Sequence, residues 1–109
     1  MSDSCFVYLL KATRLEMLTQ GPTDEEAVIL GEHVDYLARL GDEGRLLLAG
    51  RTQTHDAETF GIVIFEAPPE EAEQVVSADP AVRAGVMTAK LHPYRVAVVG
   101  KSLGQYLPA

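Results

Sequence analysis

The chain has 109 residues, 47% of them hydrophobic and 23% charged, and this balance predicts a single globular domain over residues 1–109. Its formal net charge is −7, from 16 acidic and 9 basic residues. This charge excludes nucleic acid and an anionic membrane surface as expected partners, because both are recognised by clustered Lys and Arg. With one cysteine, no apolar run near ~20 residues and no segment typical of a signal peptide, we expect a cytoplasmic protein.

The first half of the chain predicts a strand, a helix and a second strand, with a long loop before the helix. Residues 5–10 are apolar and rich in aromatic and β-branched side chains, which is typical of a strand. Thr23-Asp-Glu-Glu26 is a capping-box pattern, which predicts the start of a helix over residues 23–42. The leucine-rich residues 45–53 suit a second strand.

The predicted helix over residues 23–42 is amphipathic. At about 100° per residue, its expected apolar arc contains Ala27, Leu30, Val34, Leu37, Ala38 and Leu40. The opposite, solvent-facing side carries Glu25, Glu32, Asp35, Arg39 and Asp42. His33 falls inside the apolar arc, so we expect its imidazole to point toward the core, where a polar ring needs a partner.

The second half predicts a strand, a helix, a short helix and a last strand, followed by a tail. These segments cover residues 60–65, 68–78, 80–84, 88–99 and 100–109 in that order. Proline near the first turn and glutamates in that turn favour the start of the helix over residues 68–78.

The resulting order, β-α-β-β-α-β, predicts an α+β fold of the ferredoxin-like kind, in which an antiparallel sheet carries both helices on one face. Pro93 supports this topology, because a proline inside the final strand is tolerated at a sheet edge, and the last strand of this fold is an edge.

The strands are apolar on both faces, and two helices cover only one face of a sheet. A soluble monomer does not leave the second apolar face bare. We therefore expect a homodimer that packs sheet to sheet, and the tail over residues 100–109, with Leu103, Tyr106 and Leu107, is a further candidate for packing on the dimer.

The candidate chemistry centres on His33 and Asp79. A carboxylate fixes the tautomer of an imidazole and holds it ready as a general base. Asp79 also precedes Pro80, which makes it a good N-cap for the short helix. The two roles are compatible, and the alternative for His33 is a core histidine that only donates a hydrogen bond.

Four further residues are candidates for substrate contact. His92 and Tyr94 share one face of the last strand and are candidates for the rim of a pocket. Arg14 in the long loop is a candidate partner for a substrate carboxylate. Met17 in the same loop suggests a flap with an apolar underside.

No metal or cofactor is expected. The three histidines lack the helical spacing of metal ligands, and there is no cysteine cluster. The chain also contains no glycine-rich phosphate loop and no nucleophile elbow.

From Phe6 to Val99, the chain resembles the YCII-related family, whose members are small proteins of the dimeric α+β barrel superfamily. The resemblance rests on four segments: Gly31-Glu-His33, Gly44-Arg-Leu-Leu-Leu-Ala-Gly50, Ala78-Asp-Pro-Ala-Val-Arg-Ala-Gly85 and Lys90-Leu-His-Pro-Tyr-Arg95. It implies that His33 and Asp79 are the proposed histidine–aspartate pair of the family, facing a small cleft between the first helix and the sheet.

The resemblance also implies proton transfer on a small ring, since a relative is a lactone dehydrochlorinase and related barrels include muconolactone isomerases. We therefore expect a cofactor-free isomerase or lyase acting on a small acidic or lactone-like metabolite, with His33 as base and Asp79 orienting it. The alternative is a non-catalytic module that binds a small metabolite or a protein in the same cleft. In a third interpretation the pair is only a buried structural contact.

Overall fold

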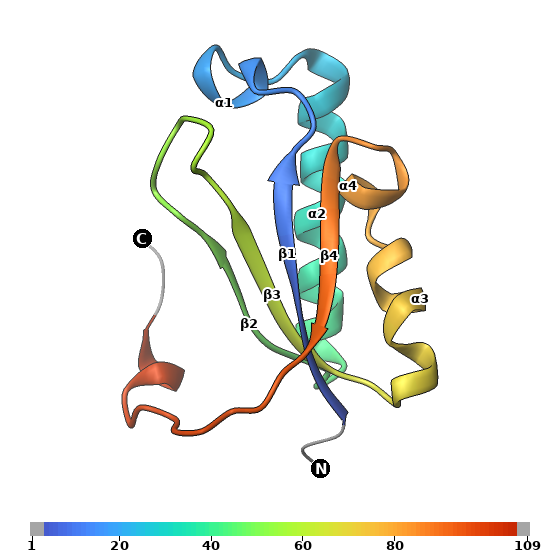
Figure 1. The fold of residues 1–109 in the computed structure, drawn as a ribbon, viewed down its shortest axis with the longest axis vertical. Helices are drawn as coiled ribbons and strands as arrows, with labels where there is room; N and C mark the ends of the chain where they lie inside the picture. Colours follow the sequence, from blue (N-terminus) through green and yellow to red (C-terminus); the bar gives the residue numbers. More distant parts are fainter. Residues whose placement is uncertain (1–3, 107–109) are drawn as a thin grey trace.

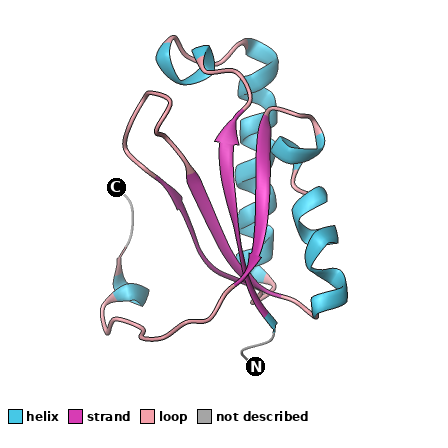
Figure 2. Ribbon diagram, in the orientation of Figure 1, coloured by secondary structure: helices cyan, strands magenta, loops and turns pink. Residues whose placement is uncertain are grey.

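A four-stranded antiparallel sheet carries α2, α3 and α4 on one face in the computed structural model, which describes residues 4–106 (Figures 1 and 2). The strands are β1 (Cys5–Ala12), β2 (Leu46–Arg51), β3 (Gly61–Glu66) and β4 (Met87–Pro93), in the order β2-β3-β1-β4. The helices are α1 (Glu16–Thr19), α2 (Asp24–Asp42), α3 (Ala72–Ser77) and α4 (Pro80–Arg83), with 3₁₀ turns η2 (Pro69–Glu71) and η3 (Leu103–Gln105). This arrangement confirms the predicted α+β ferredoxin-like fold.

The start of α2 is built by the predicted capping box. The Thr23 hydroxyl accepts a hydrogen bond from the Glu26 N–H at 3.1 Å, and the Glu26 carboxylate accepts one from the Thr23 N–H at 2.9 Å. Arg14 then binds both oxygens of Glu26, at 2.9 Å and 2.6 Å. The loop that carries α1, an element missing from the sequence-based expectation, is thereby tied to the first turn of α2.

The Arg14–Glu26 ion pair makes stability depend on pH in acid. Hydrogen bonds from Arg14, and then from the Thr23 N–H, lower the pKa of Glu26 from 4.5 to about 2. Because the folded-state pKa is the lower one, this contribution is present above about pH 4.5 and is lost as the pH falls toward 2. Glu26→Gln keeps the cap oxygen but does not titrate. We expect the free energy of unfolding, from urea titrations at pH 5 and pH 3, to fall more in the wild type than in Glu26→Gln. Equal falls would contradict this.

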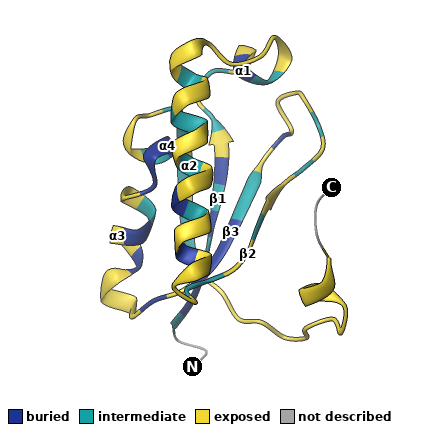
Figure 3. Ribbon diagram, turned by 180° about the vertical axis from the view of Figure 1, so that it is seen from behind, coloured by how far each residue is buried: buried dark blue, intermediate teal, exposed yellow. Residues whose placement is uncertain are grey.

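The inward face of α2 is rotated relative to the predicted arc. Tyr36 and Leu40 are buried, and Ile29, Leu30, His33 and Leu37 are partly buried. The expectation is wrong for Ala27, Val34 and Ala38, which are exposed (Figure 3). The rotation follows from Tyr36, whose hydroxyl donates a 2.6 Å hydrogen bond to the Val75 carbonyl and so turns its side of the helix toward α3. His33 keeps its predicted inward direction.

The last strand ends at Pro93, so the predicted end at Val99 is wrong. Phe6 of β1 pairs with Pro93, and the Tyr94 N–H donates to the Cys5 carbonyl at 2.9 Å. Because β1 begins at Cys5, β4 has no strand opposite it beyond this point, and the chain leaves the sheet (Figure 1). Pro93 thus terminates an edge strand, as its missing N–H favours. Leu107 of the predicted tail lies outside the described residues.

The two faces of the sheet differ in what covers them. Tyr8, Leu10, Val63 and Phe65 point toward the helices and belong to the buried core. On the other face, Val7 pairs with Ile64 and Leu9 with Ile62, and this apolar stripe has no helix over it. Within residues 4–106, no helix is both long and apolar enough to span a membrane.

Candidate active site

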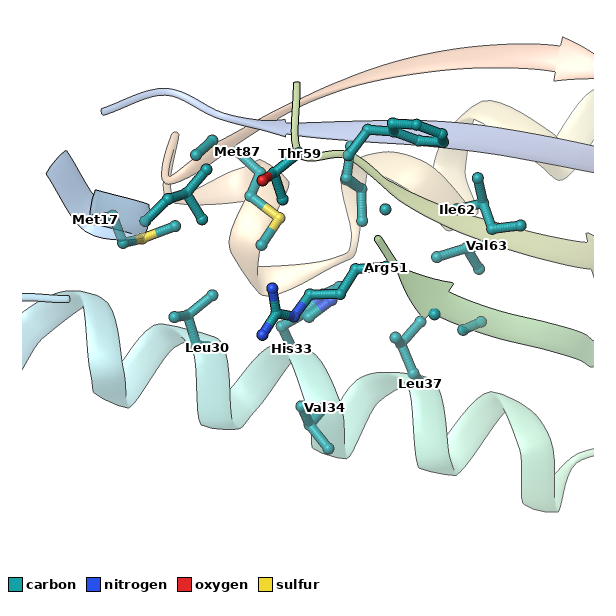
Figure 4. Close-up of a pocket in the computed structure, with 17 residues that line it drawn as sticks. Met17, Leu30, His33, Val34, Leu37, Arg51, Thr59, Ile62, Val63 and Met87 are labelled. Carbon is teal, nitrogen blue, oxygen red and sulfur yellow. The ribbon is translucent and has the colours of Figure 1, made fainter. Parts of the chain in front are cut away.

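A cavity of about 360 Å³ lies between α2 and the end of the sheet where β1 and β2 finish and β3 and β4 begin (Figure 4). Its lining comes from α1, α2 and all four strands and is mainly apolar. The lining residues are Leu10, Ala12, Met17, Leu18, Leu30, His33, Val34, Leu37, Ala49, Gly50, Arg51, Thr59, Phe60, Gly61, Ile62, Val63 and Met87.

His33 and Asp79 are hydrogen-bonded beside this cavity. The His33 Nδ1 lies 2.8 Å from one carboxylate oxygen of Asp79 and 2.9 Å from the other. The Asp79 side chain has no exposed surface and caps α4, since its Oδ1 accepts the Ala81 N–H at 3.0 Å. The pairing and capping that the sequence suggested for Asp79 therefore occur together.

Tyr8 also donates a hydrogen bond to Asp79, a contact that was not predicted from the sequence. Its hydroxyl donates to the Asp79 Oδ2 at 2.7 Å from a fully buried position in the middle of β1. Burial, and then the Asp79 carboxylate, raise the pKa of Tyr8 far above its usual value, so the phenol remains a donor at neutral pH. The position of this tyrosine at the centre of an apolar strand indicates such a contact, because the hydroxyl of a buried tyrosine needs a hydrogen-bond partner.

The hydrogen bonds around Asp79 favour one tautomer of His33. A carboxylate that receives the Tyr8 hydroxyl and the Ala81 N–H is held as an acceptor, so it favours a proton on His33 Nδ1. The lone pair of the neutral ring then sits on Nε2, which makes no hydrogen bond to any residue in 4–106. Because His33 lines the cavity, this arrangement is compatible with a general base that acts on a bound molecule.

Arg51 is the second charged side chain of the cavity and was also missed. A β-bulge between Leu46 and Leu48 shifts the register of β2, so Ala49 pairs with Val63 and Arg51 with Gly61 on the helix-covered face. The Arg51 side chain lies in front of His33 in the view of the cavity in Figure 4, and both residues line the cavity. Simple alternation along a run of apolar residues does not reveal a bulge, so the placement of Arg51 could not be predicted from the sequence.

The other predicted contact residues are dispersed. Met17 lines the cavity. Arg14 is held by Glu26 and is absent from the lining. His92 pairs with Val7 on the open face, and Tyr94 follows β4 at the sheet end remote from Met87, so neither lines the cavity. Among residues 4–106, no group of three or more His, Cys, Asp or Glu side chains is arranged to hold a metal ion.

A sequence-family model matches most of the chain. The sequence model described as a YCII-related domain matches residues 6–91. No curated protein matches the chain in sequence.

Solved structures with a similar fold include 5-chloro-2-hydroxyhydroquinone dehydrochlorinase from Burkholderia phenoliruptrix AC1100, in complex with 2,5-dihydroxybenzoquinone. It is 19% identical, with a TM-score of 0.58 over 83% of this chain and 93% of that one, which shows a shared fold. The regulatory subunit of aspartate kinase from Thermus thermophilus is 11% identical, with a TM-score of 0.46 over 85% of this chain and 52% of that one. The designed protein Ferredog-Diesel is 15% identical, with a TM-score of 0.45 over 82% and 83% of the two chains. The last two scores are too low for us to infer anything from them.

Proposed function

This chain belongs to the YCII-related family, and we propose that it is a cofactor-free acid–base enzyme, of the isomerase or lyase type, acting on a small acidic or lactone-like molecule. The observation that carries the proposal is the His33–Asp79 contact at the wall of an apolar cavity. A non-catalytic metabolite- or protein-binding module remains the alternative, and it predicts binding without turnover.

In the proposed reaction, His33 Nε2 takes a proton from a carbon next to a carbonyl group. The electrons of the broken C–H bond form an enolate, and Asp79 stabilises the resulting imidazolium through Nδ1. In an elimination, the enolate electrons form a C=C bond as the leaving group departs with its own electron pair. In an isomerisation, the imidazolium returns the proton to another carbon.

The first experiment is an exchange and turnover assay. Wild-type protein is incubated in D₂O with small lactones, keto acids and 5-chloro-2-hydroxyhydroquinone, and NMR follows deuterium entry next to the carbonyl while chloride release is measured. Exchange or turnover that depends on His33 supports an enzyme. Saturable binding in the cavity with no exchange supports the alternative module.

We also propose a homodimer in the cytoplasm, packed through the open sheet face, with the tail after β4 contributing to the contact. The apolar stripe of Val7, Leu9, Ile62 and Ile64, over which no helix lies, supports it, as do the exposed Val98 and Tyr106 of the tail. Sedimentation equilibrium is expected to give the mass of two 11.8 kDa chains, and Val7→Lys to shift it toward one. A wild-type monomer at tens of micromolar would refute the dimer.

A further inference from the structure

We propose that Arg51 is the anion-binding residue of the cavity and that the ligand is an apolar body carrying one carboxylate or similarly delocalised oxyanion. This inference rests on the proposed function, because it takes the cavity beside His33 as the substrate site. It moves the anion-binding role from Arg14, where the sequence suggested it, to a residue that the register of β2 brings to the cavity.

The charge around Arg51 is the first support. Arg51 is the one arginine or lysine that lines the cavity within residues 4–106, and like Arg39, Arg83 and Arg95 it forms no ion pair there. Arg14 pairs with Glu26 and Arg45 with Glu43, whereas within residues 4–106 no carboxylate lies within ion-pair distance of Arg51. Its one hydrogen bond, to the Thr52 carbonyl, is long at 3.5 Å. No Asp or Glu lines the cavity, so nothing there competes with an anionic ligand.

The backbone at Arg51 is the second support. Arg51 pairs with Gly61 at the end of β2, and its side chain lies over the cavity from the side opposite α2 (Figure 4). A Cβ on Gly61 would lie 3.3 Å from the Gly50 carbonyl oxygen and 3.8 Å from the Arg51 Cβ. Glycine at this position therefore allows β3 to approach the Gly50 carbonyl closely, and this pairing places Arg51 on the helix-covered face.

The remaining lining defines the rest of the ligand. Of the polar side chains in the cavity, the Thr59 hydroxyl is already engaged by Thr54 at 2.7 Å and by the Asp56 N–H at 3.2 Å. His33 and Arg51 are then the two groups with polar capacity to spare, against walls that are otherwise apolar. A ligand bound here places its oxyanion on Arg51, its proton-bearing carbon near His33 and its apolar body against α1 and α2. In the proposed reaction, the guanidinium also stabilises the charge that develops on the enolate oxygen.

The test compares a carboxylate with its neutral isostere. Titrations of 2-naphthoate and 2-naphthamide, followed by ¹⁵N NMR shifts, are expected to give a preference of about tenfold for the carboxylate, because an arginine fork pairs with both its oxygens at a partly solvated site. Arg51→Gln is expected to abolish the preference and Arg51→Lys to keep part of it. Arg39→Gln removes the same charge from an exposed position of α2 outside the cavity and is expected to retain the full preference.

An unchanged preference in a folded Arg51→Gln protein, shifts that map outside the cavity, or no binding of either probe would each overturn the inference. Because binding is measured without turnover, the two proposals fail separately. Arg51-dependent binding with no reaction in any assay would refute the enzyme and leave the anion site standing. Turnover together with a carboxylate preference that does not depend on Arg51 would refute the anion site and leave the enzyme standing.

Discussion

Replacing His33 by glutamine is expected to lower kcat/KM by about a hundred- to ten-thousand-fold for any substrate found in the exchange assay, which is the usual worth of a positioned general base. The glutamine side chain retains an N–H that donates to Asp79 but offers no basic nitrogen to the cavity. The variant thus removes the chemistry while preserving the polar contact that holds α2 to α4. The rates are measured under kcat/KM conditions in H₂O and, for exchange, in D₂O.

His55→Gln is the matched control, since His55 lies exposed in the turn between β2 and β3 and outside the cavity lining. It is expected to keep the wild-type rate. If a folded His33→Gln protein, checked by its NMR spectrum and urea midpoint, retained turnover within a factor of a few, His33 would not be the base. A loss of activity that merely followed a loss of folded protein would assign the pair a structural role instead.

The fold was predictable because its signals are local. The capping box at Thr23 and Glu26 marks the start of α2 directly, and the apolar strands are short enough to be recognised by composition. The ends of elements were less predictable, because they depend on partners distant in sequence. The β4 strand stops at Pro93 because no strand lies opposite the residues that follow it. Where β1 begins determines this end, and the residues after Pro93 carry no signal of it.

The candidate site was predictable only in part, for the same reason. His33 could be found because helical periodicity points it inward, and Asp79 because it precedes Pro80 and matches a family segment. Tyr8 and Arg51 were not identified from the sequence, because their positions depend on contacts between segments that are distant in the chain. Tyr8 reaches Asp79 across 71 positions of sequence, and a bulge in β2 decides which face Arg51 occupies. No periodicity within one segment encodes either contact.

Asp79→Ala is expected to lower the free energy of unfolding by about 2 to 4 kcal/mol, from an orphaned buried hydroxyl and a lost helix cap. The buried carboxylate accepts from the Tyr8 hydroxyl, the Ala81 N–H and His33, and alanine replaces none of these. Asp79→Asn keeps an oxygen for the cap, so its loss is expected to be about 1 kcal/mol. Asp79→Asn also removes the negative charge that would stabilise the imidazolium form of His33, so turnover is expected to fall even though the fold is retained. Urea denaturation at pH 7 measures the free energies of unfolding.

The origin of the Asp79→Ala loss is separable with Tyr8→Phe, which deletes only the buried hydroxyl. Because the orphaned phenol accounts for part of the cost of Asp79→Ala, adding Tyr8→Phe to that variant is expected to restore about 1 kcal/mol or more, whereas Tyr8→Phe alone destabilises the wild type. Strict additivity of the two substitutions would mean that the Tyr8–Asp79 hydrogen bond is energetically silent. In that case the hydroxyl would not hold Asp79 as an acceptor, and the preference for a proton on His33 Nδ1 would rest on the helix cap and the carboxylate charge alone.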